Sequence, residues 1–220
     1  MTPLVRVTPG SACLNTPEAK RRELAALVEQ LVLEDAAGVP TYYVLGGDAA
    51  PSSGLDCSGL VVWAARQLGL DLKRLGIRVT DDMWRRFARV ETPEPGDVAL
   101  YGSGREPDPA VHVVVVLGEG PDAGGYRVAS MSGGGRWCTS LQLARERTPP
   151  ARLREFKSQH YGRGDFIGFY RLPFADGNAT ATAATDARPV LPAGEISDPE
   201  AYAAALAAGR IEELPPGGAS

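Results

Sequence analysis

A cysteine stands between an aspartate and a Ser-Gly pair in the stretch GLDCSGLVVWAARQLGL, residues 54–70. The apolar residues that follow recur at helical spacing and stop at Gly69, so Cys57 is predicted at the N-terminus of an amphipathic helix. The helix dipole and the backbone N–H groups of the first turn stabilise a thiolate there. The same N–H groups can receive an oxyanion when the thiolate attacks a carbonyl. The alternative is a small buried side chain that happens to begin a helix.

His112 opens the apolar run VHVVVVLG, where an imidazole needs a polar partner. The loop EGPDAGG predicts a hairpin that joins this run to YRVASMS. If the hairpin is symmetric about Pro121, residue 116 faces 126, residue 114 faces 128, and His112 faces Ser130. Ser130 would then hold one ring nitrogen and leave the other for Cys57, as in a thiol hydrolase. The alternative is a histidine that is satisfied inside the core.

Reactive side chains are otherwise scarce. The remaining histidine, His160, is predicted in a surface loop, and Cys138 is predicted to be structural, although it could in principle pair with Cys13. With two histidines and three widely spaced cysteines, we expect no metal site built by the protein.

The elements around these residues change character along the chain. Helices are predicted over residues 17–37, capped by Asn15 or Thr16 and stopped by Gly38, then from Cys57 to Gly69, and behind Thr80 in TDDMWRRFARV. After TPEPGD, strands are predicted in VALYG, VHVVVVLG, YRVASMS and DFIGFYRLP. Helices first and antiparallel strands afterwards indicate an α+β domain.

Charge and composition divide the chain into three parts. Residues 176–220 hold seven acidic and two basic side chains, or −5, which leaves about +1 for the rest of a chain of net charge −4. We expect an N-terminal extension over residues 1–15, a catalytic domain over 16–174, and an Ala/Pro/Gly-rich linker or disordered tail over 175–220. No dense basic stripe points to nucleic acid. No apolar run of about 20 residues predicts a membrane span, and the first residues lack the apolar region of a secretory signal.

Four stretches, taken in order, resemble the successive motifs of the NlpC/P60 cysteine peptidases over roughly residues 20–172. They are GVPTYYVLGG…GLDCSGLVVWAARQLGL, PGDVALYG, HVVVVLGEG and YRVASMSGGG. The resemblance implies a papain-like α+β fold in which N-terminal helices pack on a central antiparallel sheet. It also implies Cys57 as the nucleophile and His112 as the general base and later the acid.

The same resemblance assigns supporting residues. It implies that the Tyr43 hydroxyl helps to hold the oxyanion or the substrate, and that Asp56 and Ser58 shape the substrate pocket. The family's third polar residue is usually His, sometimes Asn or Gln, and the matching position here is Ser130. The departure leaves open a Cys–His dyad, with Ser130 orienting the imidazole without bringing charge.

The function that the resemblance implies is hydrolysis of peptidoglycan stem peptides, at the γ-glutamyl bond to the third-position diamino acid, without metal or organic cofactor. Asp56 could receive the free amine at the N-terminus of such a peptide. Two alternatives remain: a non-catalytic wall-binding or phage virion structural module on the same scaffold, and an amidase that cuts between glycan and peptide. The setting could be a phage lysin or tail component, a secreted effector or a cytoplasmic recycling enzyme.

Overall fold

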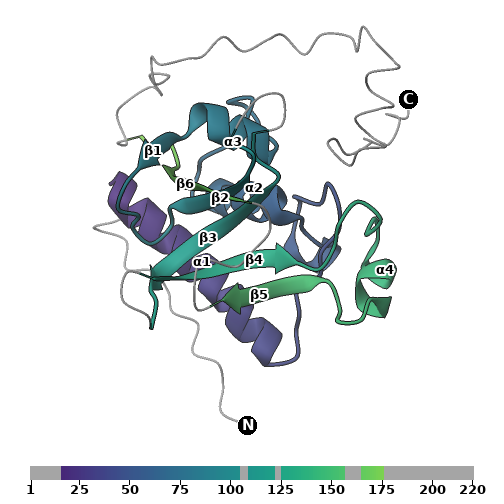
Figure 1. Cartoon of the computed structure of the whole chain (residues 1–220). Helices are drawn as coiled ribbons and strands as arrows, with labels where there is room; N and C mark the ends of the chain where they lie inside the picture. The colour runs from purple at the N-terminus through teal and green to yellow at the C-terminus, as the bar shows by residue number, and fades with distance from the viewer. Residues whose placement is uncertain (1–15, 105–108, 122–124, 157–164, 176–220) are drawn as a thin grey trace, which may run out of the picture.

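The computed structural model describes residues 16–104, 109–121, 125–156 and 165–175 (Figure 1). The helices are α1 (Pro17–Ala36), a short 3-10 turn η1 (Pro51–Ser53), α2 (Cys57–Gln67), α3 (Thr80–Arg86) and α4 (Leu141–Glu146). The strands are β1 (Ala88–Val90), β2 (Val98–Gly102), β3 (His112–Glu119), β4 (Tyr126–Ser132), β5 (Arg152–Phe156) and β6 (Asp165–Arg171). None of the helices in the described segments is long and apolar enough to cross a membrane.

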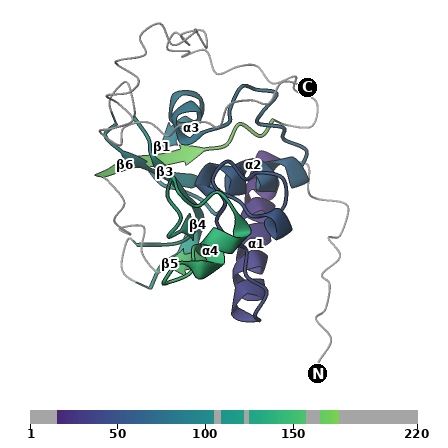
Figure 2. The same cartoon turned by 90° about the vertical axis from the view of Figure 1, so that its right-hand side faces the viewer.

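The six strands form one antiparallel sheet in the order β1-β6-β2-β3-β4-β5. Helices α1 and α2 lie together against one face of this sheet, where both contact β3 and β4 (Figure 2). Strand alternation sends the side chains of Val113, Val115, Ala129 and Met131 into that helix-facing core. A second apolar cluster lies on the other face and contains Tyr101, Val114, Val116 and Val128. The predicted α+β architecture, with helices packed on an antiparallel sheet, is confirmed.

The helix ends follow from local chemistry. The Thr16 hydroxyl accepts a hydrogen bond from the Ala19 N–H at 3.2 Å, which confirms the predicted cap of α1. Gly38 and Gly69 follow α1 and α2 with φ of +90° and +82°, a conformation that favours glycine at helix C-termini. The helix behind Thr80 is shorter than predicted: it ends at Arg86, and residues 88–90 pair with β6 as β1. Strand β5 and helix α4 were not predicted.

The PGD turn before β2 joins three distant segments. Gly96 has a φ of +90°, and a side chain there would overlap the backbone carbonyl of Arg21 in α1, so this position requires glycine. The Gly96 N–H donates to the Val116 carbonyl at 2.8 Å, and the Val116 N–H donates to the Asp97 carbonyl at 2.9 Å. The turn therefore fixes the N-terminal part of α1, at Arg21, against the middle of β3, at Val116.

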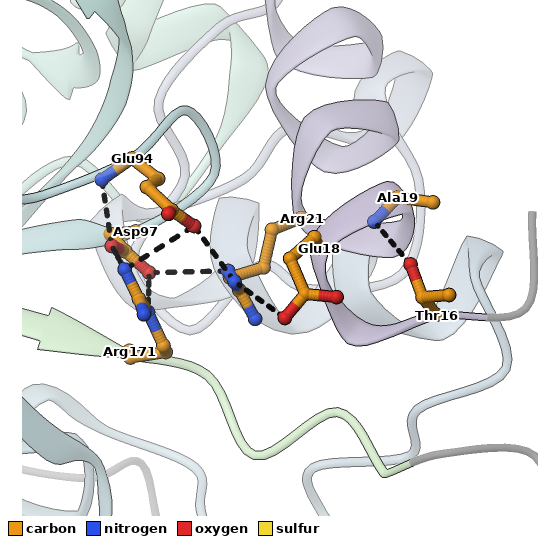
Figure 3. A network of polar contacts seen from close by, with 7 residues as sticks. All are labelled: Thr16, Glu18, Ala19, Arg21, Glu94, Asp97 and Arg171. Carbon is orange, nitrogen blue, oxygen red and sulfur yellow. Dashed lines mark hydrogen bonds and ion pairs between the residues drawn. The ribbon is translucent and has the colours of Figure 1, made fainter.

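Asp97 is fully buried and is surrounded by cations (Figure 3). Arg171, at the end of β6, donates to its carboxylate through Nε at 3.0 Å and Nη2 at 2.8 Å. Arg21 from α1 places its Nε 3.6 Å from the same carboxylate and donates through Nη2 to Glu94 at 2.8 Å. The Glu94 backbone N–H also donates to Asp97 at 2.9 Å. A buried carboxylate is stable only with such partners, so Asp97 holds α1, the turn and β6 together.

Asp97→Asn should lower the free energy of unfolding by about 3 kcal/mol, because it leaves two arginines without the charge that they enclose. The matched control is Glu94→Gln, which changes a carboxylate that is 48% exposed in the same network and should cost less than about 1 kcal/mol. Urea unfolding of the two variants checks the difference. Equal losses would show that Asp97 does not hold the network.

Candidate active site

Cys57 is the first residue of α2, and Asp56 caps that helix. The Asp56 carboxylate accepts from the Gly59 N–H at 2.6 Å and the Ser58 hydroxyl at 2.9 Å through Oδ1, and from the Gly46 N–H at 2.8 Å through Oδ2. Cys57 itself is half-buried and packs against the helix-facing core. The structure therefore presents the thiol at a capped helix N-terminus, as predicted from the sequence.

Glycines allow the loop at residues 46–47 to approach the N-terminus of α2 closely. A side chain at Gly59 would overlap the Gly47 carbonyl, and that carbonyl accepts from the Asp56 N–H at 2.9 Å. Gly46 adopts a φ of +73°, which turns its N–H toward Asp56. In the stretch DCSG, the aspartate, serine and glycine thus each have a local role in fixing the segment that carries Cys57.

His112 and Ser130 lie together, with His112 Nε2 and Ser130 Oγ 2.9 Å apart. Both side chains are buried, and the Ser130 hydroxyl also lies 3.1 Å from the Val113 carbonyl and 3.2 Å from the Met131 carbonyl. The predicted contact between these two residues is confirmed.

The register that led to this contact is wrong by two residues. Val116 pairs with Val128 instead of residue 126, and the register shifts again between Val116 and Gly118. A shift of two residues keeps every side chain on its face of the sheet, so Ser130 still meets His112, as a diagonal neighbour.

The sheet faces constrain how Cys57 and His112 can meet. The pairing of Tyr101 with His112 places the imidazole on the face of the second apolar cluster, whereas Cys57 packs against the helix-facing core. His112 is the first residue of β3, so the two side chains can approach each other only around the start of that strand. The Cys57–His112 pairing stays a prediction.

Two residues of α3, which the sequence did not single out, position the start of β3. The Thr80 hydroxyl donates to the Ala110 carbonyl at 2.7 Å, and Asp81 Oδ1 accepts from the Ala110 N–H at 2.9 Å. Both backbone groups of Ala110 are thereby fixed two residues before His112. The only sequence signal was the pair of acids in the first turn of α3, which also suits a helix N-terminus.

Tyr43 is buried beside the segment that leads to Cys57, with 7% of its surface exposed. It bridges to Leu55, and its carbonyl accepts a hydrogen bond from the Cys138 thiol at 3.3 Å. A side chain at Gly134 would overlap the Tyr43 ring, so the ring is held tightly. The structural role predicted for Cys138 is confirmed, and burial raises the pKa of its thiol. The contact of the Tyr43 hydroxyl with an oxyanion stays a prediction.

Two of the reactive residues named from the sequence cannot be placed in the structure. His160 and Cys13 lie outside the described residues, and so do residues 1–15 and 176–220. Within the described part of the chain, no three His, Cys, Asp or Glu side chains are grouped as metal ligands.

One family model matches part of the chain. Residues 40–124 match the model of the NlpC/P60 family. This segment is an NlpC/P60 domain. It contains Tyr43, Asp56, Cys57, Ser58 and His112, and it ends before Ser130. No curated protein matches the chain.

Solved structures with a similar backbone include two Trichomonas vaginalis proteins, NlpC2 (18% identity, TM-score 0.49) and NlpC1 (19%, 0.47). A lipoprotein-like NLP/P60 family protein from Staphylococcus aureus follows at 21% identity and a TM-score of 0.42. The matches cover 75%, 69% and 66% of this chain but only 49%, 43% and 41% of those proteins.

Burial gives Asp56 a pH-dependent effect on stability. It raises the pKa of the carboxyl group above the ordinary 3.8, although hydrogen bonds from Gly59, Gly46 and Ser58 partly offset the rise. The folded protein therefore holds this proton more tightly than the unfolded chain. The free energy of unfolding should fall as the pH rises from 3.8 to the raised value. Asp56→Asn should flatten this slope in urea unfolding measured across that pH range.

The control for the cap alone is Ser140→Ala, which removes the neutral cap of α4 and should cost about 1 kcal/mol at every pH. A slope as steep in Asp56→Asn as in the native protein would contradict the assignment.

Proposed function

We propose that this chain is a cysteine peptidase that hydrolyses peptidoglycan stem peptides. The NlpC/P60 domain supports a peptidase of the cell wall, and the thiol at the capped N-terminus of α2 supplies the nucleophile. The observation that carries the proposal is the 2.9 Å contact between His112 and Ser130, at the start of the strand against which α2 packs. A thiol hydrolase needs a histidine in which a hydrogen bond holds one ring nitrogen, so that the other ring nitrogen can take the proton of the thiol.

The surroundings of Ser130 favour one tautomer of His112. A serine hydroxyl has a single proton, and the two carbonyls near it, those of Val113 and Met131, can only accept. When the hydroxyl donates to one of them, its lone pair receives the His112 Nε2–H. The proton then resides on Nε2, and Nδ1 is the basic atom.

In the proposed mechanism, His112 Nδ1 takes the Cys57 proton and the thiolate attacks the amide carbonyl carbon. The Cys57 backbone N–H and the Tyr43 hydroxyl stabilise the oxyanion, because the Gly59 N–H is already committed to the cap. The C–N bond breaks, and the imidazolium returns its proton to the leaving amine. Water, deprotonated by His112, then attacks the thioester and releases the acid and the thiol.

The finer proposal is the γ-glutamyl bond to the third-position diamino acid, with the free amine of the peptide near Asp56. Each Asp56 oxygen already accepts a bond from the protein, so an amine would use a remaining lone pair. Ser58, whose hydroxyl donates to Asp56, would keep the carboxylate oriented toward the substrate.

Cys57→Ala should abolish the release of peptide fragments from purified peptidoglycan, measured by mass spectrometry of the digest. The matched control is Cys138→Ser, since a hydroxyl can keep the hydrogen bond to the Tyr43 carbonyl and should leave the digest unchanged. Identical digests from the native protein and Cys57→Ala would favour the wall-binding module. Whole stem peptides detached from the glycan would favour the amidase.

His112→Ala should lower the rate by at least about 100-fold, the usual scale of general acid–base catalysis. Ser130→Ala should cost less and should act on kcat more than on KM, because it leaves the imidazole in place but unoriented. Steady-state kinetics on a synthetic stem peptide separates the two effects. An unchanged rate in His112→Ala would exclude the dyad.

A further inference from the structure

The loop over residues 133–140, between β4 and α4, is fastened to the candidate active site. It leaves β4 just after Ser132, two residues beyond Ser130. Its Cys138 carbonyl accepts from the Leu45 N–H at 2.8 Å, and its Cys138 thiol donates to the Tyr43 carbonyl at 3.3 Å. Gly134 lies directly on the Tyr43 ring. The loop therefore packs against the segment of Tyr43 and Leu45, which is itself joined to Leu55 and Asp56 just before Cys57.

This anchored loop exposes an indole. Trp137 is 72% exposed, although its neighbour Cys138 is completely buried. The Arg136 guanidinium carbon lies 4.7 Å from the centre of the Trp137 ring, within the range of a cation–π contact. Stacking holds the planar guanidinium in one orientation, which lowers the entropy cost of binding a carboxylate through two hydrogen bonds. Tryptophan and arginine are the residue types that most often carry binding energy at interfaces, so this pair is a candidate binding site.

The loop and the helix α4 that follows it carry an excess of positive charge. Residues 133–147 hold three arginines, Arg136, Arg145 and Arg147, against the single carboxylate of Glu146. Arg145 stacks on Tyr42, the neighbour of Tyr43, at 5.0 Å from the ring centre. Arg147 is close enough to Cys138 to offset part of the rise that burial causes in the pKa of that thiol. An arginine in a segment with this excess of positive charge suits an anion with a planar, two-oxygen head.

We propose that Arg136 and Trp137 form a subsite that binds a carboxylate of the stem peptide, with the indole covering the adjoining aliphatic part. The proposal rests on the proposed function for the identity of the peptide. It adds a specificity that Cys57 and His112 do not provide: peptides with a free carboxylate at this position are preferred over their amides.

Binding is measured without turnover, in the Cys57→Ala protein, by calorimetry with synthetic stem tetrapeptides. One peptide has all its carboxylates free, a second carries a C-terminal amide, a third lacks the side-chain carboxylate of the diamino acid, and a fourth has the α-carboxylate of its γ-linked glutamate converted to an amide. One of the three modified peptides should bind about fivefold more weakly, which identifies the carboxylate that is bound.

Arg136→Gln, added to Cys57→Ala, should remove this preference, whereas Arg22→Gln on the exposed side of α1 should leave it intact. The indole N–H resonance of Trp137, assigned by its loss in Trp137→Phe, should shift on binding while those of Trp63 and Trp84 do not. Equal affinities for the four peptides, or a preference that survives Arg136→Gln, would overturn the subsite. Failure of the proposed function would appear separately, as hydrolysis that does not depend on Cys57.

Discussion

The fold depends on one carboxylate that no water reaches. Asp97 is fully buried, and the arginines that make its burial tolerable come from opposite ends of the described chain, Arg21 in the first helix and Arg171 at the end of the last strand. Apolar packing alone would allow α1 to slide along the sheet, since hydrophobic contact has no direction. The charged pairs have direction, and they bring α1 and β6 to the turn that begins β2. Because β2 pairs with β3, this arrangement also places the strand that starts with His112.

The same combination of a glycine and a nearby aspartate joins two segments twice in the structure, once in the core and once at the candidate site. In each case a glycine lets two backbones approach more closely than a side chain would allow, and a neighbouring aspartate satisfies the polar groups that the approach buries. Gly96 with Asp97 does this between α1 and the sheet, and Gly59 with Asp56 does it between α2 and the loop at Gly46. Two of the motifs that resemble NlpC/P60 peptidases are therefore explained by packing and hydrogen bonding before any chemistry is invoked.

The sequence predicted those elements whose ends depend on residues close together in the chain. The errors lie where the structure depends on residues far apart in the chain. The Thr16 cap, the stop at Gly69 and the strand that begins with His112 depend on residues within a few positions of one another. The register of β3 and β4 failed because the hairpin is not symmetric about Pro121 and carries an irregularity between Val116 and Gly118, which no local pattern marks.

Elements with few apolar residues were also missed. Strand β5 reads RLREF, and its place at the sheet edge needs only Leu153 to be fully buried. The contacts of Thr80 and Asp81 with Ala110 join residues about 30 positions apart, so they could not be predicted without the fold. The partnership of His112 and Ser130 survived the register error because a strand repeats every two residues.

The charges around Asp97 also limit how far the chain can be shortened without disturbing the fold. The family match spans residues 40–124, but a fragment cut to those limits would lack both guanidinium groups that enclose this buried carboxylate. It would have to bury Asp97 without these partners or expose it to water, and either change would loosen the turn that holds β3. An autonomous domain must therefore include Arg21 on one side and Arg171 on the other, so its boundaries are set by charge neutrality as well as by the extent of the sheet.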